Sequence, residues 1–235
     1  MLLPAELKNR DQDGPSTADV LYSWFKRSLD ILLSSVGLLV MAPVFVVIAA
    51  VIKVDSRGPV LYGQERIGLN RRRSRGTRRS TDERRKRDTL GRPFKIWKFR
   101  TMIVDAEKDT GAVWAQANDS RITRVGKILR NSRLDEFPQL WNVLRGDMSL
   151  VGPRPERPSF VLSLSESLPD YPKRCFALPG ITGLAQVKSK YDTSIETVNR
   201  KLAYDLYYVR HGRIMLDFKI MVATLKVMAR GEGAH

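Results

Sequence analysis

The sequence predicts an α+β fold whose N-terminal helix is embedded in a membrane. Three observations carry this prediction: one long uncharged apolar segment, two short segments with strand-like alternation, and two long amphipathic segments near the C-terminus. At 235 residues, the chain is long enough for one sizeable domain with an appendage. We therefore expect a membrane helix, then a small β-hairpin, then a mainly helical region.

The composition indicates an anionic partner and a reducing compartment. The chain has 41 Lys and Arg against 25 Asp and Glu, a net charge of +16, which fits nucleic acid, an acidic membrane surface or a phosphorylated substrate. The single cysteine, Cys175, excludes an internal disulfide. His211 and His235 are too few and too scattered for a His-based zinc site. Any metal is therefore expected to be a hard cation held by carboxylates and phosphate oxygens.

Residues 31–52 contain no charged residue, and this run is long enough to span a bilayer. Pro43 lies in its middle, where it removes a backbone hydrogen bond and bends a helix. Two geometries remain open: a kinked span, or a broken helix that enters and leaves the membrane on one face. We favour the re-entrant geometry because it puts Lys26 and Lys53 on the same headgroup side. A buried helix of a soluble core is the alternative.

Residues 60–67 and 93–102 alternate roughly between apolar and polar side chains and are predicted as two strands. An arginine-rich insert, residues 69–90, separates them. From residue 71 to 90 it carries ten basic residues against three acidic ones, a net charge of +7. Such a segment cannot bury a core, so we expect a disordered loop. Nucleic-acid binding and contact with anionic lipid both fit this charge, and the nearby membrane segment favours lipid.

Two helices are predicted at residues 194–209 and 214–228, each apolar on one face. Asp205 and Asp217 interrupt these apolar patterns and are candidates for buried polar residues. Residues 121–133 form a basic amphipathic segment. The sequence contains neither a P-loop nor a G-x-G-x-x-G fingerprint, which argues against an ordinary kinase or dehydrogenase.

Asp135 and Glu136 form an adjacent acidic pair that precedes a short predicted helix at residues 139–145. Pro138 fits the first helical position and Gly146 fits the C-terminal stop. The unpaired N–H groups and the positive dipole end of this helix would attract anions toward the acidic pair.

A different reading of the same segment is structural. Ser132-Arg-Leu-Asp135 also matches a capping box, and the segment alone does not separate the two readings. Arg154 lies between two prolines that hold it near the acidic pair, although it also fits a salt bridge that holds a loop. Lys98 and Arg100 are one strand period apart and would share a face, which suits phosphate binding or a solvated strand edge.

Several longer motifs occur in a fixed order along residues 26–226. They are GQERIG, FKIWKFRTM, RITRVGKILR, RLDEFPQLWNVLRGDMSLVGPRP, PGITGLAQV, YDLYYV and LDFKI. This series resembles the bacterial sugar transferase family, the monotopic phosphoglycosyl transferases. The resemblance leaves out only the N-terminal arm and the arginine-rich insert.

The resemblance implies a polyprenyl-phosphate sugar-1-phosphate transferase. Such an enzyme moves a sugar-1-phosphate from a UDP-sugar to undecaprenyl phosphate, releases UMP and gives undecaprenyl-diphosphate-sugar. This is the first membrane step of exopolysaccharide, O-antigen or glycoprotein glycan assembly. It also implies a catalytic domain that faces the cytoplasm from the bacterial inner membrane and contacts anionic lipid. A homodimer stays open, and no nucleic-acid partner is expected.

In this family the acidic pair is catalytic. Asp135 would be the nucleophile that carries the phosphosugar, and Glu136 would help to hold Mg²⁺. The substrate-binding positions carried over, or placed beside them on the strand, are Lys98, Arg100, Arg130, Arg154, Asp205 and Asp217. The chemistry is consistent with this pattern, because a carboxylate that attacks a diphosphate needs cations to offset the like charges.

We therefore divide the chain into a flexible arm (1–18), a re-entrant membrane helix (19–58) and a catalytic domain (59–230). One departure concerns the membrane helix, which has Ala42-Pro43 where many relatives have Ser-Pro. Two competing functions are a non-catalytic scaffold that binds anionic lipid through the insert and, from charge alone, a nucleic-acid binder. The apolar segment argues against the latter.

Overall fold

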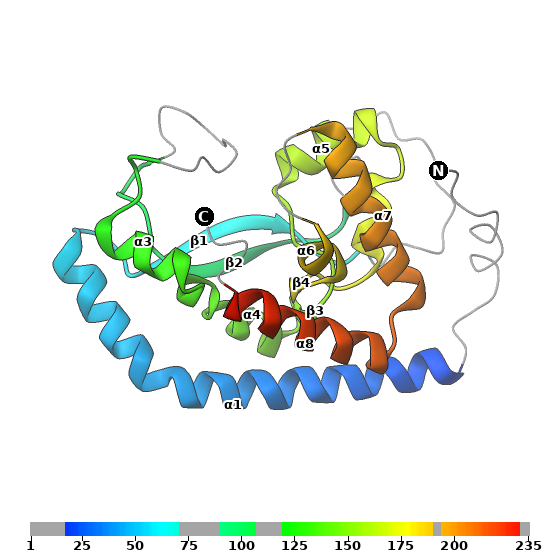
Figure 1. Ribbon diagram of the computed structural model, residues 1–235, viewed down its shortest axis with the longest axis horizontal. Helices are drawn as coiled ribbons and strands as arrows, with labels where there is room; N and C mark the ends of the chain where they lie inside the picture. The colour runs from blue at the N-terminus through cyan, green and yellow to red at the C-terminus, as the bar shows by residue number, and fades with distance from the viewer. Residues whose placement is uncertain (1–16, 71–89, 107–118, 190–193, 231–235) are drawn as a thin grey trace.

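The computed structural model describes residues 17–70, 90–106, 119–189 and 194–230. Residues 1–16 of the predicted arm and almost all of the arginine-rich insert lie outside these residues, whereas residues 17 and 18 belong to the first helix. In chain order the first elements are α1 (Thr17–Asp55), β1 (Leu61–Ile67) and β2 (Pro93–Phe99), and a mainly helical region follows (Figure 1). The later elements are α3 (Arg124–Asn131), η2 (Leu134–Glu136), α4 (Gln139–Arg145), β3 (Ser149–Val151), α5 (Pro158–Ser167), η3 (Tyr171–Phe176), β4 (Gly180–Thr182), α6 (Leu184–Lys188), α7 (Ile195–His211) and α8 (Ile214–Ala229).

The N-terminal helix α1 is long and apolar enough to cross a membrane, and only 11% of its most apolar window is buried. Large apolar side chains such as Leu39 and Val46 are 78% and 71% exposed. That exposure disfavours the alternative of a buried soluble-core helix. The predicted break is instead a bend. The helix α1 changes direction in Figure 1, yet it continues from Thr17 through Asp55 with Pro43 inside it. A proline removes one backbone hydrogen bond and bends a helix without stopping the turns on either side.

The predicted β-hairpin is confirmed. Strands β1 and β2 pair antiparallel from Leu61↔Phe99 to Ile67↔Pro93. The second strand ends at Phe99, three residues earlier than predicted. Ile96 and Phe99 are buried on opposite faces of β2, and Lys98 shares the face of Ile96, from which it reaches Glu136 of η2. The hairpin therefore presents one basic side chain to the acidic pair.

A second, two-stranded sheet was not predicted. Strands β3 and β4 pair in parallel, with Ser149 opposite Gly180 and Val151 opposite Thr182. A Cβ at Gly180 would collide with the backbone of Gly152, so the two segments approach as closely as they do because both residues are glycines. The sequence pattern does not indicate this sheet, since strands of three residues carry almost no periodic signal. The loop that contains Pro153, Arg154 and Pro155 follows directly after β3 and therefore starts from this sheet.

Helices α7 and α8 confirm the two C-terminal helices. Val198, Leu202 and Leu206 of α7 pack into one buried cluster with Ile67 of the hairpin. In Figure 1, α8 lies alongside the first part of α1. Phe218 of α8 is 59% exposed, and many large apolar side chains of α1 are exposed as well.

Polar contacts join α1 to the helical region that follows the hairpin. The Arg27 guanidinium donates to the carbonyls of Val143 and Leu144 at the C-terminal end of α4, with Nη–O distances of 2.6 and 2.8 Å. Both carbonyls lie in the last turn of α4, where backbone donors are scarce, although Gly146 N also donates to Val143 O at 3.0 Å. The cation at this end also complements the helix dipole. The amino end of α4, where the acidic pair lies, is therefore held at a fixed place relative to α1.

Candidate functional site

The acidic pair lies in the turn between α3 and α4. Asp135 and Glu136 belong to the short 3-10 helix η2, which starts after Arg133 in the left-handed region with φ of 57°. Helix α4 has the predicted bounds, with Pro138 at its N-cap and Gly146 at its C-cap with φ of 85°. The acidic pair thus precedes the helix start, as predicted.

The capping-box reading is wrong. Ser132 is the C-cap of α3, and its hydroxyl donates back to the carbonyls of Ile128 and Leu129 at 2.9 and 3.2 Å. The segment around Asp135 therefore does not start a helix at Ser132. The serine lies at the end of the preceding helix instead, where its hydroxyl adds a donor to carbonyls of the last turn.

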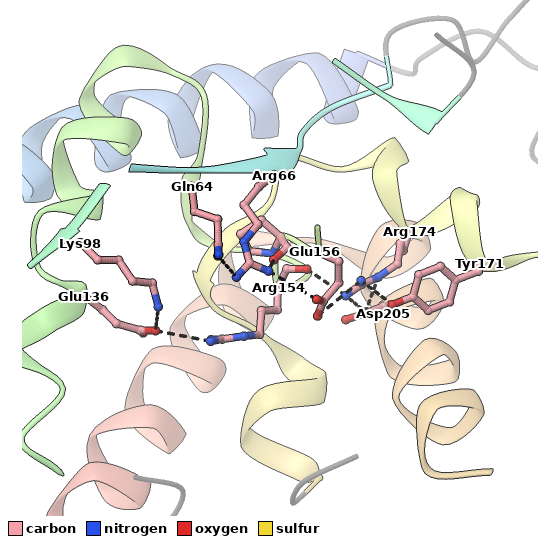
Figure 2. A network of polar contacts seen from close by, with 10 residues as sticks. Gln64, Arg66, Lys98, Glu136, Arg154, Glu156, Tyr171, Arg174 and Asp205 are labelled. Carbon is pink, nitrogen blue, oxygen red and sulfur yellow. Dashed lines mark hydrogen bonds and ion pairs between the residues drawn. The ribbon is translucent and has the colours of Figure 1, made fainter. Parts of the chain in front are cut away.

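Glu136 is held by two cations that come from distant parts of the chain. Its Oε1 atom accepts from Lys98 Nζ at 2.6 Å and from Arg154 Nη2 at 3.4 Å. Figure 2 shows the three side chains converging from the hairpin, η2 and the proline-framed loop. Burial opposes ionisation of Glu136, but Lys98 and Arg154 together hold its pKa well below the usual range. Glu136 is therefore a permanent anion at neutral pH.

The neighbouring carboxylate has the opposite electrostatic setting. Asp135 is 8% exposed, and burial raises its pKa although Lys98 opposes the shift. Among the described residues, Asp135 forms no ion pair within 4 Å. A more basic, unpaired carboxylate beside a firmly ionised one can serve as nucleophile while its neighbour organises charge. The two roles proposed from the sequence therefore have a physical basis in the fold.

A small pocket opens beside Glu136. Its polar lining comes from Arg66, Lys98, Glu136, Gln139 and Arg154. Three cations and one anion give this lining a net positive charge, which suits the phosphate groups of a substrate.

Arg130 lies next to this site rather than inside the pocket lining. Its Nε donates to Thr101 Oγ1 at 2.9 Å. Burial lowers the pKa of Arg130, and the nearby carboxylate of Asp135 opposes that shift. The structure thus brings Arg130, Lys98 and Arg154 around the acidic pair, as the sequence predicted.

The prediction that Arg100 shares a face with Lys98 is wrong. The strand ends at Phe99, and the Arg100 guanidinium donates to the carbonyl oxygens of Ser56 and Arg57 after the end of α1. Arg100 is 5% exposed. Its donors bind the carbonyls that follow the end of α1, so Arg100 has a structural place away from the pocket.

Asp205 and Asp217 are both buried and paired, at two different places. Arg174 donates from Nε and Nη2 to Asp205 Oδ2 at 2.9 and 2.6 Å. Asp217 accepts from Lys26 at 2.7 Å and from Tyr208 at 2.7 Å. Neither carboxylate lines the pocket beside Glu136. These contacts fit the alternative that both residues tie elements of the core together.

Sequence reasoning missed three residues of this network: Arg66, Glu156 and Arg174 (Figure 2). Arg66 was inside the GQERIG motif and shares a strand face with Gln64, to which it donates. The alternation of β1 therefore contained a signal for it. Arg174 lies in a segment without periodic pattern, so only the fold reveals its partners.

The carboxylates of the acidic pair fit Mg²⁺ only if substrate phosphates supply the remaining ligands. In the described part of the chain, no three His, Cys, Asp or Glu side chains are grouped closely enough to hold a metal. Mg²⁺ is usually bound by one or two carboxylates plus substrate phosphates and waters. Glu136 next to Asp135 supplies that many carboxylates, beside a pocket suited to phosphate.

Comparison with known proteins gives one family and a consistent set of relatives. Residues 21–231 match the model of the family described as bacterial sugar transferase. The chain is 36% identical over 227 residues to UDP-N-acetylgalactosamine-undecaprenyl-phosphate N-acetylgalactosaminephosphotransferase of Aeromonas hydrophila, covering 97% of this chain and 49% of that protein. It is 40% identical over 204 residues to UDP-glucose:undecaprenyl-phosphate glucose-1-phosphate transferase of Klebsiella pneumoniae, covering 86% of this chain and 39% of that protein.

The chain spans less than half the length of these two relatives. A shorter relative is matched over almost its whole length. The exopolysaccharide production protein PSS of Rhizobium leguminosarum bv. phaseoli is 38% identical over 215 residues, which cover 88% of this chain and 97% of that protein.

Proposed function

Because this chain belongs to the bacterial sugar transferase family, we propose that it is a polyprenyl-phosphate sugar-1-phosphate transferase. Its donor is a UDP-sugar and its acceptor is undecaprenyl phosphate, as the names of two relatives state for those proteins. The single observation that carries the proposal is the pairing of ionised Glu136 with Lys98 and Arg154 beside buried Asp135, which has no ion pair in the described part of the chain.

Asp135 is the nucleophile of a two-step displacement. A carboxylate oxygen of Asp135 attacks the β-phosphorus of the donor, and the bond from that phosphorus to the bridging oxygen breaks. UMP leaves with the electron pair, and the phosphosugar stays on Asp135 as an acyl phosphate. A phosphate oxygen of undecaprenyl phosphate then attacks the same phosphorus and displaces Asp135, giving undecaprenyl-diphosphate-sugar. The raised pKa of Asp135 supports this role, because a more basic carboxylate is a better nucleophile.

The cations around the pocket support charge compensation in both steps. Lys98 and Arg154 would bind diphosphate oxygens while they keep Glu136 ionised. Mg²⁺, bound by Glu136 and substrate phosphates, would supply further stabilisation of the developing negative charge. Arg130 would assist on the Asp135 side, where burial leaves its charge poorly solvated.

The membrane placement is part of the proposal. The exposed apolar faces of α1 and α8 support a catalytic domain seated at the headgroup region of the inner membrane and facing the cytoplasm. There the pocket can meet the phosphate of a polyprenyl chain. We expect the re-entrant geometry for α1, with both ends on the cytoplasmic side.

The topology can be tested by labelling engineered cysteines at exposed positions near the two ends of α1. Leu21→Cys and Val54→Cys, in a Cys175→Ser background, should react with a membrane-impermeant maleimide from the same side of sealed vesicles. Labelling from opposite sides would show that α1 spans the membrane.

The activity is tested by measuring UMP release from a panel of UDP-sugars with undecaprenyl phosphate in detergent micelles, with and without Mg²⁺. One donor should give turnover, and Asp135→Asn should abolish it. Asp147→Asn is a matched control, because Asp147 pairs with Arg145 at the other end of α4. Wild-type UMP release by Asp135→Asn would contradict the covalent mechanism. No turnover with any donor would instead favour a non-catalytic lipid-binding scaffold.

A further inference from the structure

The proline-framed loop that presents Arg154 is held at every carbonyl from residue 153 to 156. The four contacts are Gly180 N to Pro153 O at 2.9 Å, Arg174 Nη2 to Arg154 O at 3.0 Å, Arg66 Nη1 to Pro155 O at 3.1 Å and Ile67 N to Glu156 O at 2.9 Å. The donors come from β1, from η3 and from β4, so three separate parts of the fold converge on four residues.

Two of these four donors are arginine side chains, and no backbone donor replaces them. Pro153 and Pro155 have no N–H group, so the loop cannot build a regular ladder with a neighbouring strand. Arg66 and Arg174 supply the two central hydrogen bonds from positions 89 and 20 residues away in the chain. A guanidinium can donate to several acceptors at fixed angles, which suits it to such a crossing point.

The two arginines also belong to a chain of alternating charges (Figure 2). Glu156 Oε2 lies 3.5 Å from Arg66 Nη1, and Glu156 Oε1 lies 4.0 Å from Arg174 Nη1. Arg174 Nη2 lies 2.6 Å from Asp205 Oδ2. Two cations and two carboxylates make this chain neutral. The side chains of Arg174 and Asp205 are only 7% and 3% exposed, which leaves no surface for a substrate to reach.

The direction of the Arg154 side chain depends on the backbone of residues 153–156. Its side chain is 43% exposed and meets Glu136 at 3.4 Å, close to the longest distance at which a hydrogen bond forms. A small displacement of the loop would therefore break the contact. Packing around the guanidinium itself is too open to restore it.

We propose that Arg66 and Arg174 are positioning residues that fix loop 153–156 so that the Arg154 guanidinium meets Glu136 and the donor phosphates. Asp205 acts through Arg174 and does not contact substrate. The inference deepens the proposed function, since it rests on that function for the role of Arg154. The fixation of the loop does not depend on the reaction.

The test is a double-mutant cycle on kcat and KM for UMP release. Arg66→Lys and Arg174→Lys keep the charge and lose the guanidinium fork, so each should lower kcat by about 10²-fold while the unfolding temperature changes little. In an Arg154→Ala background the same substitutions should have almost no further effect on kcat. Arg145→Lys, on the exposed last turn of α4, is the control and should leave kcat unchanged.

Fold-changes that multiply in the double variants would overturn the proposal, because they would show that the two arginines act independently of Arg154. A rise in KM for Arg66→Lys that persists without Arg154 would assign Arg66 to direct donor binding instead.

Hydrogen–deuterium exchange gives a readout that needs no activity. The amides of Ile67 and Gly180 donate to loop carbonyls. They should exchange at least several-fold faster in Arg66→Lys and Arg174→Lys than in the wild type or in Arg145→Lys. Unchanged exchange would overturn the proposal even in an active enzyme. If the wild type shows no turnover, the proposed function fails, while exchange still decides whether the arginines hold the loop.

Discussion

Neutralising the two neighbouring carboxylates should abolish turnover in both cases and change stability in opposite directions. Asp135→Asn removes a buried charge whose pKa burial raises, so the substitution should stabilise the folded state at pH 7. Glu136→Gln removes a charge that Lys98 and Arg154 stabilise, so it should destabilise the folded state. Both substitutions are nearly isosteric, and packing changes are therefore small.

The size of the Glu136 effect follows from its two contacts. The bond from Lys98 at 2.6 Å joins side chains that are 21% and 15% exposed, and a charge-assisted bond of this kind contributes about 2 kcal/mol. Arg154 is 43% exposed, so solvent screening leaves its contact about 0.5 kcal/mol. Glutamine keeps a neutral acceptor that contributes about 1 kcal/mol. The net loss is about 1.5 kcal/mol, a fall in unfolding temperature of about 3–6 °C.

The Asp135 effect has the opposite sign, and its size is set by how far burial raises the pKa. Each pKa unit corresponds to about 1.4 kcal/mol of relieved cost. Each kcal/mol raises the unfolding temperature of a chain this long by about 2–4 °C.

The pH dependence also differs between the two variants. The folded-state pKa of Asp135 is raised above its ordinary value of 3.8, so its ionisation costs stability as pH rises through the folded pKa. The advantage of Asp135→Asn should therefore vanish below pH 3.8 and grow above it. The folded-state pKa of Glu136 is lowered from 4.5, so its contribution is complete above pH 4.5 and is lost as pH falls. The loss of stability caused by Glu136→Gln should therefore shrink as pH falls below 4.5.

Thermal unfolding in detergent micelles between pH 3 and pH 8, followed by circular dichroism, measures both effects. Asp147→Asn controls for the loss of one negative charge on the same part of the chain. If Asp135→Asn lowered the unfolding temperature at pH 7 as Glu136→Gln does, the assignment of opposite electrostatic settings would be wrong.

Three further perturbations follow from the packing. Arg27→Met should lower the free energy of unfolding by about 1–2 kcal/mol, because the Val143 and Leu144 carbonyls at the end of α4 each lose a charge-assisted hydrogen bond; Arg145→Met, measured alongside by thermal unfolding, should change little. Arg174→Met should cost about 3–5 kcal/mol at pH 7, because Asp205 keeps a buried charge without its partner. That loss should lessen as pH falls and Asp205 gains a proton, and a flat pH profile would contradict the pairing. Burial raises the pKa of Cys175 to about 11, so the thiol should resist iodoacetamide at pH 8 until the protein is unfolded, as mass spectrometry can show.

Local patterns were sufficient for every element with a strong period or a clear stop signal. The uncharged run of α1, the alternation of the hairpin, and the amphipathic faces of α7 and α8 each depend on neighbours a few residues apart. The bounds of α4 were predicted to the residue because Pro138 and Gly146 mark its two ends. The acidic pair and Arg154 were found for the same reason, since short motifs fix their place.

The remaining features depend on contacts between distant segments, which no local pattern encodes. The parallel pairing of β3 with β4 joins two three-residue strands that are too short to be periodic. Arg100 was placed on the wrong face because the strand ends at Phe99, where the end of α1 offers it free carbonyls.

The sequence by itself determined the long apolar helix, the hairpin, the C-terminal helices and the acidic pair at the start of α4, because propensity and periodicity act over one or two turns. Only the tertiary structure decided that Lys26 pairs with Asp217 across 191 residues and that Arg66 reaches Pro155 across 89. Burial makes an unpaired charge costly, so the buried carboxylates of Asp205 and Asp217 pair with the cations that the packing of distant segments brings to them.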